Sequence, residues 1–289
     1  MRKRLVGLLA TTMVVFAACQ GAASPSPSSP AAPSTGAAST APSTGTESTA
    51  PSGSGSASTV NLTDSAYKAE DGTDGGQLIV GDWQEANTFQ PYYSSQQSEA
   101  NVASATFANL FVYSNDYKYL PDLAKEIPTT VNGDVKVPGD SGDAMTVDWK
   151  LRDGLKWSDG EPLTCKDFQY TAKWVLDPDN VGIITSGFTD LKGKADGVEC
   201  KSDSEMILHF ANIYEGYITM FGPPLPEHYL SKIPIKDQVA GAGFRAADVN
   251  KLPVSGAFKF DTVTAGQQLK LVRNPNYTSF STGKPTLKS

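Results

Sequence analysis

Residues 20–60 constrain the fold of this 289-residue chain most strongly, because 38 of these 41 residues are Ser, Thr, Pro, Ala or Gly and Glu47 is the only charged one. Such a stretch cannot bury enough apolar surface to offset the conformational entropy that folding would cost. Its mixture of Pro with Gly and Ser is typical of a linker. We therefore expect residues 19–75 to be a disordered tether and residues 76–289 to carry the folded domain. The alternative is that this stretch is low-complexity sequence whose length serves no purpose as a tether.

The first eighteen residues have the pattern of a secretory signal peptide. Three cations at positions 2–4 precede an apolar run over residues 5–18, which is shorter than the run of about 20 apolar residues that a membrane-spanning helix needs. Phe16-Ala17-Ala18-Cys19 resembles the lipobox of bacterial lipoproteins, in which the cysteine is acylated and becomes the mature N-terminus. We expect a signal peptide at 1–18, a lipid on Cys19, and a protein anchored outside the cytoplasm, on the outer face of the bacterial cell membrane or in the periplasm. An ordinary secretory signal with a coincidental cysteine is the alternative.

The composition makes several function classes unfavourable. With 24 Lys and Arg against 31 Asp and Glu, the formal net charge is −7, which argues against a nucleic-acid partner because polyphosphate binding rests on clustered cations. Only two histidines, His209 and His228, and three cysteines are present, so we expect no metal centre and no cofactor. No Ser/His/Asp arrangement and no pair of carboxylates stands out, so we expect no catalytic residue.

Hydrophobic periodicity predicts a mixture of strands and helices. Apolar residues that alternate with polar ones, or β-forming residues between turns, predict strands. Apolar residues three and four apart predict helices, and Thr164 with Asp167 resembles a capping box that would begin one of them. Because the two kinds of element follow no regular alternation, we expect an α/β or α+β fold. The predicted elements are strands at 77–83, 145–151 and 206–210, a hairpin of 258–260 and 269–271 around Gly266, helices at 102–110 and 214–221, and a helix that begins at the Thr164 cap and stops at Asp177-Pro178.

Three further patterns favour a structural explanation over a functional one. Residues 241–246, Gly-Ala-Gly-Phe-Arg-Ala, fit the dinucleotide-binding fingerprint, but no predicted strand precedes them. The stretch from Asp177 begins like a calcium loop, yet Phe188 stands where a bidentate Glu is required. Residues 157–160, Trp-Ser-Asp-Gly, indicate a packed aromatic followed by a turn. We expect the two histidines to be surface or hydrogen-bonded residues.

The segment Leu-Arg-Asp-Gly-Leu-Lys-Trp-Ser-Asp-Gly-Glu-Pro-Leu-Thr at 151–164, followed by Asp167 and Phe168, resembles the signature of the family 5 extracellular solute-binding proteins. These are the peptide, dipeptide and nickel receptors of ABC importers. Further matches, in the order of the family, are Thr-Phe-Gln-Pro at 88–91, Leu-Pro-Asp-Leu-Ala at 120–124, Pro-Val-Ser-Gly-Ala-Phe at 253–258 and Arg-Asn-Pro-Asn-Tyr at 273–277. The last two motifs each depart from the family pattern, since Ala257 replaces the usual Pro and no Trp follows Tyr277.

The resemblance implies a mixed α/β, type II (cluster C) periplasmic-binding-protein fold. Family members are roughly twice as long as residues 76–289, so we expect this part to supply most of the first lobe and little of the second. The implied protein is a monomer when complete. It closes around an oligopeptide or a similar small solute and delivers it to an ABC permease in the membrane.

First-lobe ligand contacts in this family come from the end of the first strand, the following turn and the helix that leads to an aromatic residue. Aromatic walls bury ligand carbon, and amides bond to a peptide backbone without selecting side chains. The expected contacts are Trp83, Gln84, Asn87, Phe89 and Tyr113. For Trp83 and Phe89, the alternative is that they are simply core residues.

Lipidation of Cys19 would leave Cys165 and Cys200, and two thiols outside the cytoplasm favour a disulfide. Cys165 lies at the start of a predicted helix and Cys200 just before the strand at 206–210, so the bond would join neighbouring elements. Related exported binding proteins with a cysteine in the Pro-x-Thr-Cys setting of Cys165 also tend to carry a second cysteine at the place of Cys200. Two buried free thiols and a cysteine-only metal site are the alternatives.

Three function classes remain. The favoured one is the substrate-binding lipoprotein of an ABC transporter, because the matching motifs keep the order of the family across residues 77–285. A surface-anchored structural or adhesive lipoprotein is supported only by the anchor and the tether. A secreted hydrolase would need a nucleophile–base pair that the sequence does not show.

Overall fold

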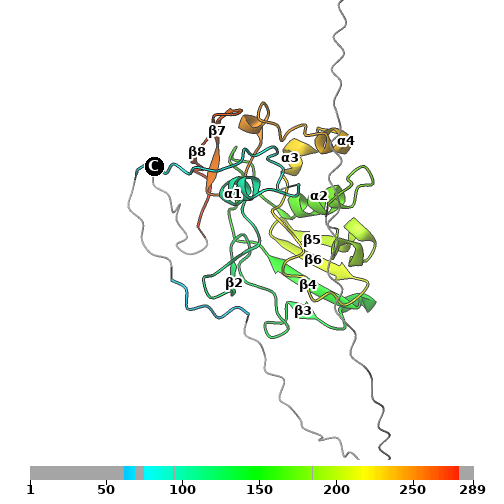
Figure 1. The fold of residues 1–289 in the computed structure, drawn as a ribbon. Helices are drawn as coiled ribbons and strands as arrows, with labels where there is room; N and C mark the ends of the chain where they lie inside the picture. The colour runs from blue at the N-terminus through cyan, green and yellow to red at the C-terminus, as the bar shows by residue number, and fades with distance from the viewer. Residues whose placement is uncertain (1–61, 69–74, 94, 184, 280–289) are drawn as a thin grey trace, which may run out of the picture. The chain divides into compact units, whose positions relative to one another are not determined.

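The central element is a four-stranded antiparallel sheet in the order β3-β4-β6-β5 (Figure 1). The computed structural model describes residues 62–68, 75–93, 95–183 and 185–279. The expected signal peptide, Cys19 and most of the expected tether therefore lie outside the described residues. The strands are β3 (Val135–Lys136), β4 (Met145–Lys150), β5 (Val198–Ser202) and β6 (Glu205–Phe210).

The alternation predicted for 145–151 is confirmed in β4. Met145, Val147 and Trp149 are buried and supply the apolar face of the strand. Thr146 is buried as well, so the second face of β4 is only partly open to solvent. The strand predicted at 206–210 is confirmed as β6, which pairs with β4 along its whole length.

The helix α2 (Cys165–Val175) lies over this sheet and contacts β5 (Figure 1). The predicted capping box begins it, since the Thr164 backbone N–H donates to the Asp167 carboxylate at 2.8 Å and the Thr164 hydroxyl accepts from the first turn. Phe168 and Ala172 are completely buried, as predicted for the inward face. This helix is confirmed in its start and its buried face, and it ends at Val175, just before the predicted stop at Asp177-Pro178.

Cys165 and Cys200 form a disulfide in the structure, with Cα atoms 5.7 Å apart. The bond joins the first residue of α2 to β5, which are neighbours in space although the two cysteines are 35 residues apart in sequence. Cys165 is fully buried and Cys200 is partly buried, so the bond lies at the edge of the core.

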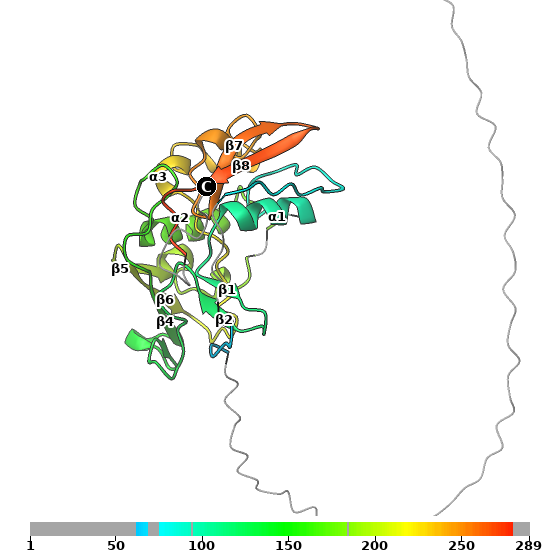
Figure 2. The same ribbon diagram turned by 90° about the vertical axis from the view of Figure 1, so that its left-hand side faces the viewer.

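A second group of elements contains α1 (Gln97–Thr106) and the hairpin of β7 (Phe258–Thr264) and β8 (Gln268–Arg273), with α1 against β7 (Figure 2). The hairpin around Gly266 is confirmed. Gly256 brings the segment before β7 onto the end of α1, because its N–H donates to the Thr106 carbonyl at 2.8 Å. A Cβ at this position would lie 2.5 Å from the Thr106 carbonyl carbon, so only glycine fits.

The remaining elements are short. β1 (Phe111–Tyr113) and β2 (Tyr119–Pro121) form a two-stranded hairpin. No helix in the described part of the chain is long and apolar enough to span a membrane. The helical turns are α3 (Glu227–Leu230), α4 (Ile235–Val239), η1 (Asp140–Gly142), η2 (Phe188–Asp190), η3 (Lys194–Gly197) and η4 (Val249–Lys251).

The prediction of a strand at 77–83 is wrong for this structure. Residues 75–82 have no assigned secondary structure, and among the described residues no strand pairs with them. Leu78, Ile79 and Trp83 are 87%, 82% and 84% exposed. A β-forming composition does not make a strand by itself, because the backbone groups need a partner strand.

Two helix predictions also need correction. The helix expected over 102–110 begins earlier, at Gln97, and ends at Thr106, because Phe107 adopts an extended backbone and closes the helix with its N–H on Ala103. Residues 214–221 form turns and not a helix. Two glycines and two prolines in and just after this segment interrupt a helix, since glycine and proline are the weakest helix formers.

The segments that carry the family resemblance meet in the core. Arg152, from the segment at 151–164, lies with its Nη2 3.6 Å from Oδ1 of Asp122, which belongs to the segment at 120–124. The Tyr277 hydroxyl, from the last motif, donates to the same Asp122 oxygen at 3.5 Å. Asn276 donates from Nδ2 to the Trp157 carbonyl at 2.9 Å. These contacts hold distant segments together. Other residues of the motifs line the cavities described below, Ser158, Asp159 and Pro253 in one and Thr88 in the other.

Residues 62–68 lie against the β1–β2 hairpin. The Ser65 hydroxyl donates to Oδ1 of Asp116 at 2.7 Å, and the Tyr119 N–H donates to the Leu62 carbonyl at 2.9 Å. Hydrogen bonds from Ser114 and Ser65 lower the pKa of the Asp116 carboxyl to about 2. Contact with the folded domain thus begins inside the segment that the composition assigns to the tether.

Candidate ligand-binding site

The structure does not bring the five predicted ligand contacts into one cavity. Trp83 is exposed on the unpaired segment, and Gln84 beside it is half-buried. Phe89 is buried in the core, with its ring 5.2 Å from the Phe260 ring. Tyr113 is 59% exposed on the β1–β2 hairpin. Asn87 is exposed and lines a cavity.

The turn that carries Asn87 is held by the buried carboxylate of Glu99 on α1. This carboxylate accepts the backbone N–H of Asn87 at 3.1 Å, of Ser95 at 2.8 Å and of Gln96 at 3.2 Å. Three N–H donors compensate the desolvation of a buried carboxylate. The start of α1 therefore fixes both ends of the turn over residues 87–96.

Aromatic rings join the same turn to α2. The rings of Tyr92 and Tyr93 each lie 5.7 Å from the Trp174 ring. The Tyr93 hydroxyl bonds to Oδ1 of Asn180, whose Nδ2 donates to the Trp174 carbonyl at 2.7 Å. Burial raises the pKa of Tyr92 and of Tyr93, so both phenols stay protonated at neutral pH. These contacts hold the turn against α2.

A cavity of about 320 Å³ separates this turn from the loop at 239–245. Asn87, Thr88 and Tyr93 line one side, and Phe244 and Arg245 belong to the other. The cavity therefore combines aromatic rings with an amide, a hydroxyl and one cation. This is the mixture that small-ligand sites use to bury carbon and to orient polar groups.

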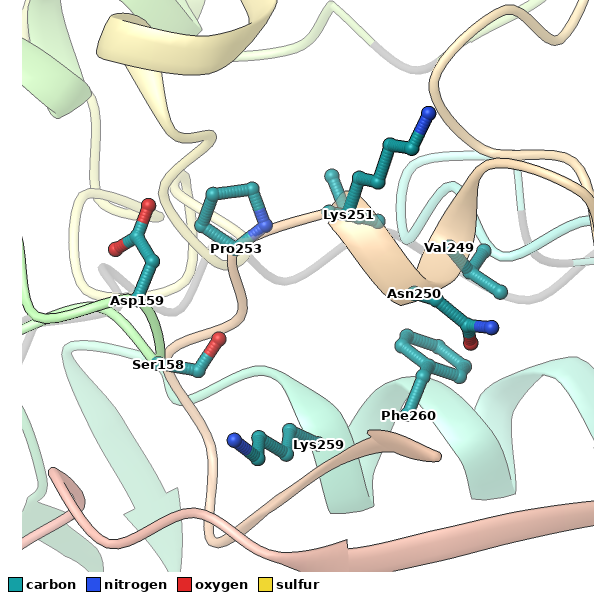
Figure 3. Close-up of a pocket in the computed structure, with 9 residues that line it drawn as sticks. Ser158, Asp159, Val249, Asn250, Lys251, Pro253, Lys259 and Phe260 are labelled. Atoms are coloured by element: carbon teal, nitrogen blue, oxygen red, sulfur yellow. The ribbon is translucent and has the colours of Figure 1, made fainter. Parts of the chain in front are cut away.

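A second cavity, of about 180 Å³, lies between the turn at 158–159, η4 and the start of β7. Figure 3 shows the Lys259 side chain extending along one side of it in the direction of Ser158, with Phe260 and Asn250 on the other side. Lys251 points away from the other labelled side chains (Figure 3). The Ser158 hydroxyl already accepts the Val254 N–H at 3.1 Å, which ties this wall of the cavity to the core.

The β1–β2 hairpin presents a cluster of aromatic rings. Tyr113 and Tyr119 lie opposite each other in register, with ring centroids 5.2 Å apart, and the Phe111 ring is within 5.3 Å of both. Tyr113 is thus held by its neighbours while more than half of it faces solvent. This arrangement suits stacking on a ligand.

Both histidines are hydrogen-bonded, as expected from their sequence positions. His209 bonds through Nδ1 to Asp143 at 2.6 Å and through Nε2 to Glu199 at 2.8 Å. Hydrogen bonds from Lys192 and His209 lower the pKa of the Asp143 carboxyl. His228 bonds to Asp159 at 2.9 Å. Within the described residues no group of three or more His, Cys, Asp or Glu side chains is placed to hold a metal ion.

Comparison with known proteins decides the family. The family model of the bacterial extracellular solute-binding proteins, family 5 (Middle), matches residues 118–289. The chain belongs to this family. The family is described as one of bacterial extracellular solute-binding proteins.

Two family 5 relatives show the extent of the similarity. The oligopeptide-binding protein AppA of Bacillus subtilis (strain 168) is 28% identical over 207 residues, which cover 70% of this chain and 34% of AppA. The solved structure of AppA in complex with a nonapeptide matches with a TM-score of 0.57 and covers 71% of this chain and 37% of that chain. The ABC transporter substrate-binding protein CtaP of Listeria monocytogenes matches at 27% identity with a TM-score of 0.55, over 71% of this chain and 38% of CtaP.

This family 5 chain spans about a third of the length of these relatives. The fold class predicted from the sequence is confirmed, since the structural neighbours are type II periplasmic-binding proteins and the chain is mixed α/β. Sequence reasoning missed Tyr93, Phe244 and Arg245 as cavity residues. Arg245 lies in the stretch that superficially matched the dinucleotide fingerprint, and its relation to Asn87 depends on a contact between segments about 150 residues apart.

Proposed function

We propose that this chain belongs to the substrate-binding component of an ABC importer and captures peptides outside the cytoplasm. The observation that carries the proposal is the 28% identity to the oligopeptide-binding protein AppA over 70% of the chain. The solved structure of AppA holds a nonapeptide and matches at the same identity. Capture and release require no covalent chemistry, which agrees with the absence of a catalytic motif from the sequence.

The proposal assigns different roles to the five predicted contacts. Asn87 offers an exposed side-chain amide on a turn held by Glu99, and amides suit the backbone of a peptide whatever its side chains are. Trp83, Gln84 and Tyr113 offer surface that is at least partly open to solvent. Phe89 would support the site without contacting the ligand, because its ring packs the same segment onto Phe260.

The segments before the folded domain would anchor it at the membrane. Residues 1–18 would be removed as a signal peptide, Cys19 would carry the lipid, and the segment up to residue 75 would tether the domain at 76–289. The contacts of residues 62–68 with Asp116 support a tether that joins the domain at the β1–β2 hairpin. A membrane permease would receive the captured solute.

Ligand-induced stabilisation tests the proposed function. The complete protein would be purified from the membranes of the bacterium that encodes it and its melting temperature measured with and without a mixture of short peptides. We expect a rise in melting temperature and recovery of intact peptides from the complex by mass spectrometry, because a ligand that binds only the folded state stabilises it. Shortened peptides would favour a hydrolase, and no change in melting temperature would favour an adhesive or structural lipoprotein.

A further inference from the structure

The cavity between the turn at 87–93 and the loop at 239–245 has the composition of a site for a small organic acid. We propose that it binds a carboxylate that carries an apolar or aromatic body, with Arg245 as the residue that takes the carboxylate. This inference goes beyond the proposed function, because such an acid can occupy the cavity whether or not the protein captures peptides.

Arg245 is oriented before any ligand arrives. Its Nη2 donates to the Ala240 carbonyl at 2.6 Å. Gly241 has a φ of +97°, and a Cβ there would lie 3.2 Å from Nε and 3.4 Å from Cγ of Arg245. The absence of a side chain at Gly241 therefore leaves room for the Arg245 side chain to pass over the loop.

The Arg245 guanidinium also has donors left for a ligand. The hydrogen bond to Ala240 uses one of its five N–H groups. In the part of the chain that the structure describes, no carboxylate forms an ion pair with Arg245. An unpaired guanidinium at a cavity is notable in a chain with a net charge of −7. It offers the fork geometry that carboxylates prefer.

Two polar residues on the opposite side can share the same carboxylate. The hydrogen bonds of the described residues engage the backbone N–H of Asn87 but not its side-chain amide. The Thr88 hydroxyl accepts the Gln90 N–H at 3.1 Å, which leaves its own proton to donate. Arg245, Asn87 and Thr88 thus provide three kinds of donor around one cavity, and none of them brings a competing negative charge.

The other walls favour an apolar body on the ligand. Phe244 is 1% exposed and cannot move away without opening the core. Tyr93 is held by its bond to Asn180 and by its contact with Trp174. The volume of about 320 Å³ is at the lower end for ligand sites, so it suits an acid of amino-acid size.

A matched pair of probes tests this site in the 289-residue chain. N-acetylphenylalanine and its amide differ only in the carboxylate, so titration of each into ¹⁵N-labelled protein isolates that group. We expect the free acid to shift the Arg245 Nε–H and Asn87 side-chain signals with a millimolar dissociation constant, and the amide to bind at least about tenfold more weakly. Equal binding of acid and amide, or no shift with the acid at tens of millimolar, would overturn the proposal.

Variants of Arg245 test whether its guanidinium binds the carboxylate of the free acid. Arg245→Gln should weaken binding of the free acid at least about tenfold, and Arg245→Lys should retain part of the affinity because the charge remains without the fork. Lys236→Gln removes an equal charge from the neighbouring helix α4 without touching the cavity, and it should leave the affinity within about twofold. Unchanged affinity in Arg245→Gln, with a native ¹⁵N spectrum, would contradict the assignment. Peptide capture by the complete protein is a separate readout, so the two proposals fail independently.

Discussion

Arg152 and Asp122 lie 3.6 Å apart in the interior, with the Tyr277 hydroxyl 3.5 Å from the same carboxylate oxygen. Three segments that mark the family therefore meet around one buried acid. The contacts are long for hydrogen bonds, and the remaining one, from the Asn109 N–H, is 3.3 Å. They do not offset the desolvation of Asp122, and burial raises its pKa to about 6 against the attraction of Arg152.

The raised pKa of Asp122 predicts a pH dependence of stability. Because the folded state holds this proton more tightly than the unfolded state, the contribution is fully present below the ordinary pKa of 3.8 and is lost as pH rises through about 6. The lost free energy of unfolding is on the order of 2–3 kcal/mol. Urea unfolding at pH 4 and pH 7 should show this loss in the native chain and not in Asp122→Asn. Parallel pH profiles for the two proteins would contradict the prediction.

The disulfide between Cys165 and Cys200 predicts the behaviour of two variants. In a Cys19→Ser background, the denatured and unreduced protein should contain no thiol that iodoacetamide alkylates. Replacing both cysteines by serine should lower the free energy of unfolding by about 3–4 kcal/mol, since the bond closes a loop with a sequence separation of 35. Two alkylated thiols before reduction would show that the pair is free.

The contact between Asp116 and residues 62–68 predicts a local effect on hydrogen exchange. Asp116→Ala removes the acceptor of the Ser65 hydroxyl and the Ala66 N–H. Exchange of the Ala66 and Tyr119 amides should accelerate about three- to tenfold, as expected for the loss of one or two exposed hydrogen bonds. Asp153→Ala, which breaks the exposed pair with Lys125, is the control. Equal exchange in both variants would show that residues 62–68 do not depend on Asp116.

The unpaired segment at 77–83 predicts self-association of the 289-residue chain. Leu78, Ile79 and Trp83 are large apolar residues, exposed within one short segment, and a cluster of exposed apolar side chains favours association. Sedimentation velocity should show association that grows with concentration and that Leu78→Ser with Ile79→Thr reduces. Val131→Ser is the control, because Val131 is 90% exposed but has no large apolar neighbour in its turn. A monomer at every concentration would contradict the prediction.

Local sequence patterns were sufficient to predict an element where nearby residues determine its start, its end and its buried face. The capping box of Thr164 and Asp167 begins α2, and the alternation of Met145, Val147 and Trp149 marks the buried face of β4. The turn at Gly266 likewise sets the β7–β8 hairpin. These features act between residues close in sequence, so one sequence reveals them.

Long-range contacts explain what the sequence could not predict. Residues 77–83 have the composition of a strand, but pairing depends on an edge elsewhere in the chain. The candidate site shows the same limit, because Asn87 was predicted from a motif while Arg245 reaches its cavity only through tertiary packing. Phe89 and Tyr113 lie in neither cavity, since one packs on Phe260 and the other on Tyr119.

Peptide uptake by living cells tests whether this protein captures peptides for import. The gene would be deleted in the bacterium that encodes it, and uptake of labelled tri- to pentapeptides would be measured with and without a plasmid copy. We expect that deletion lowers uptake, that the native gene restores it, and that Cys19→Ala restores less because the receptor is no longer held at the membrane. Peptide uptake that is unchanged by the deletion would show that the protein is not a peptide receptor of this cell.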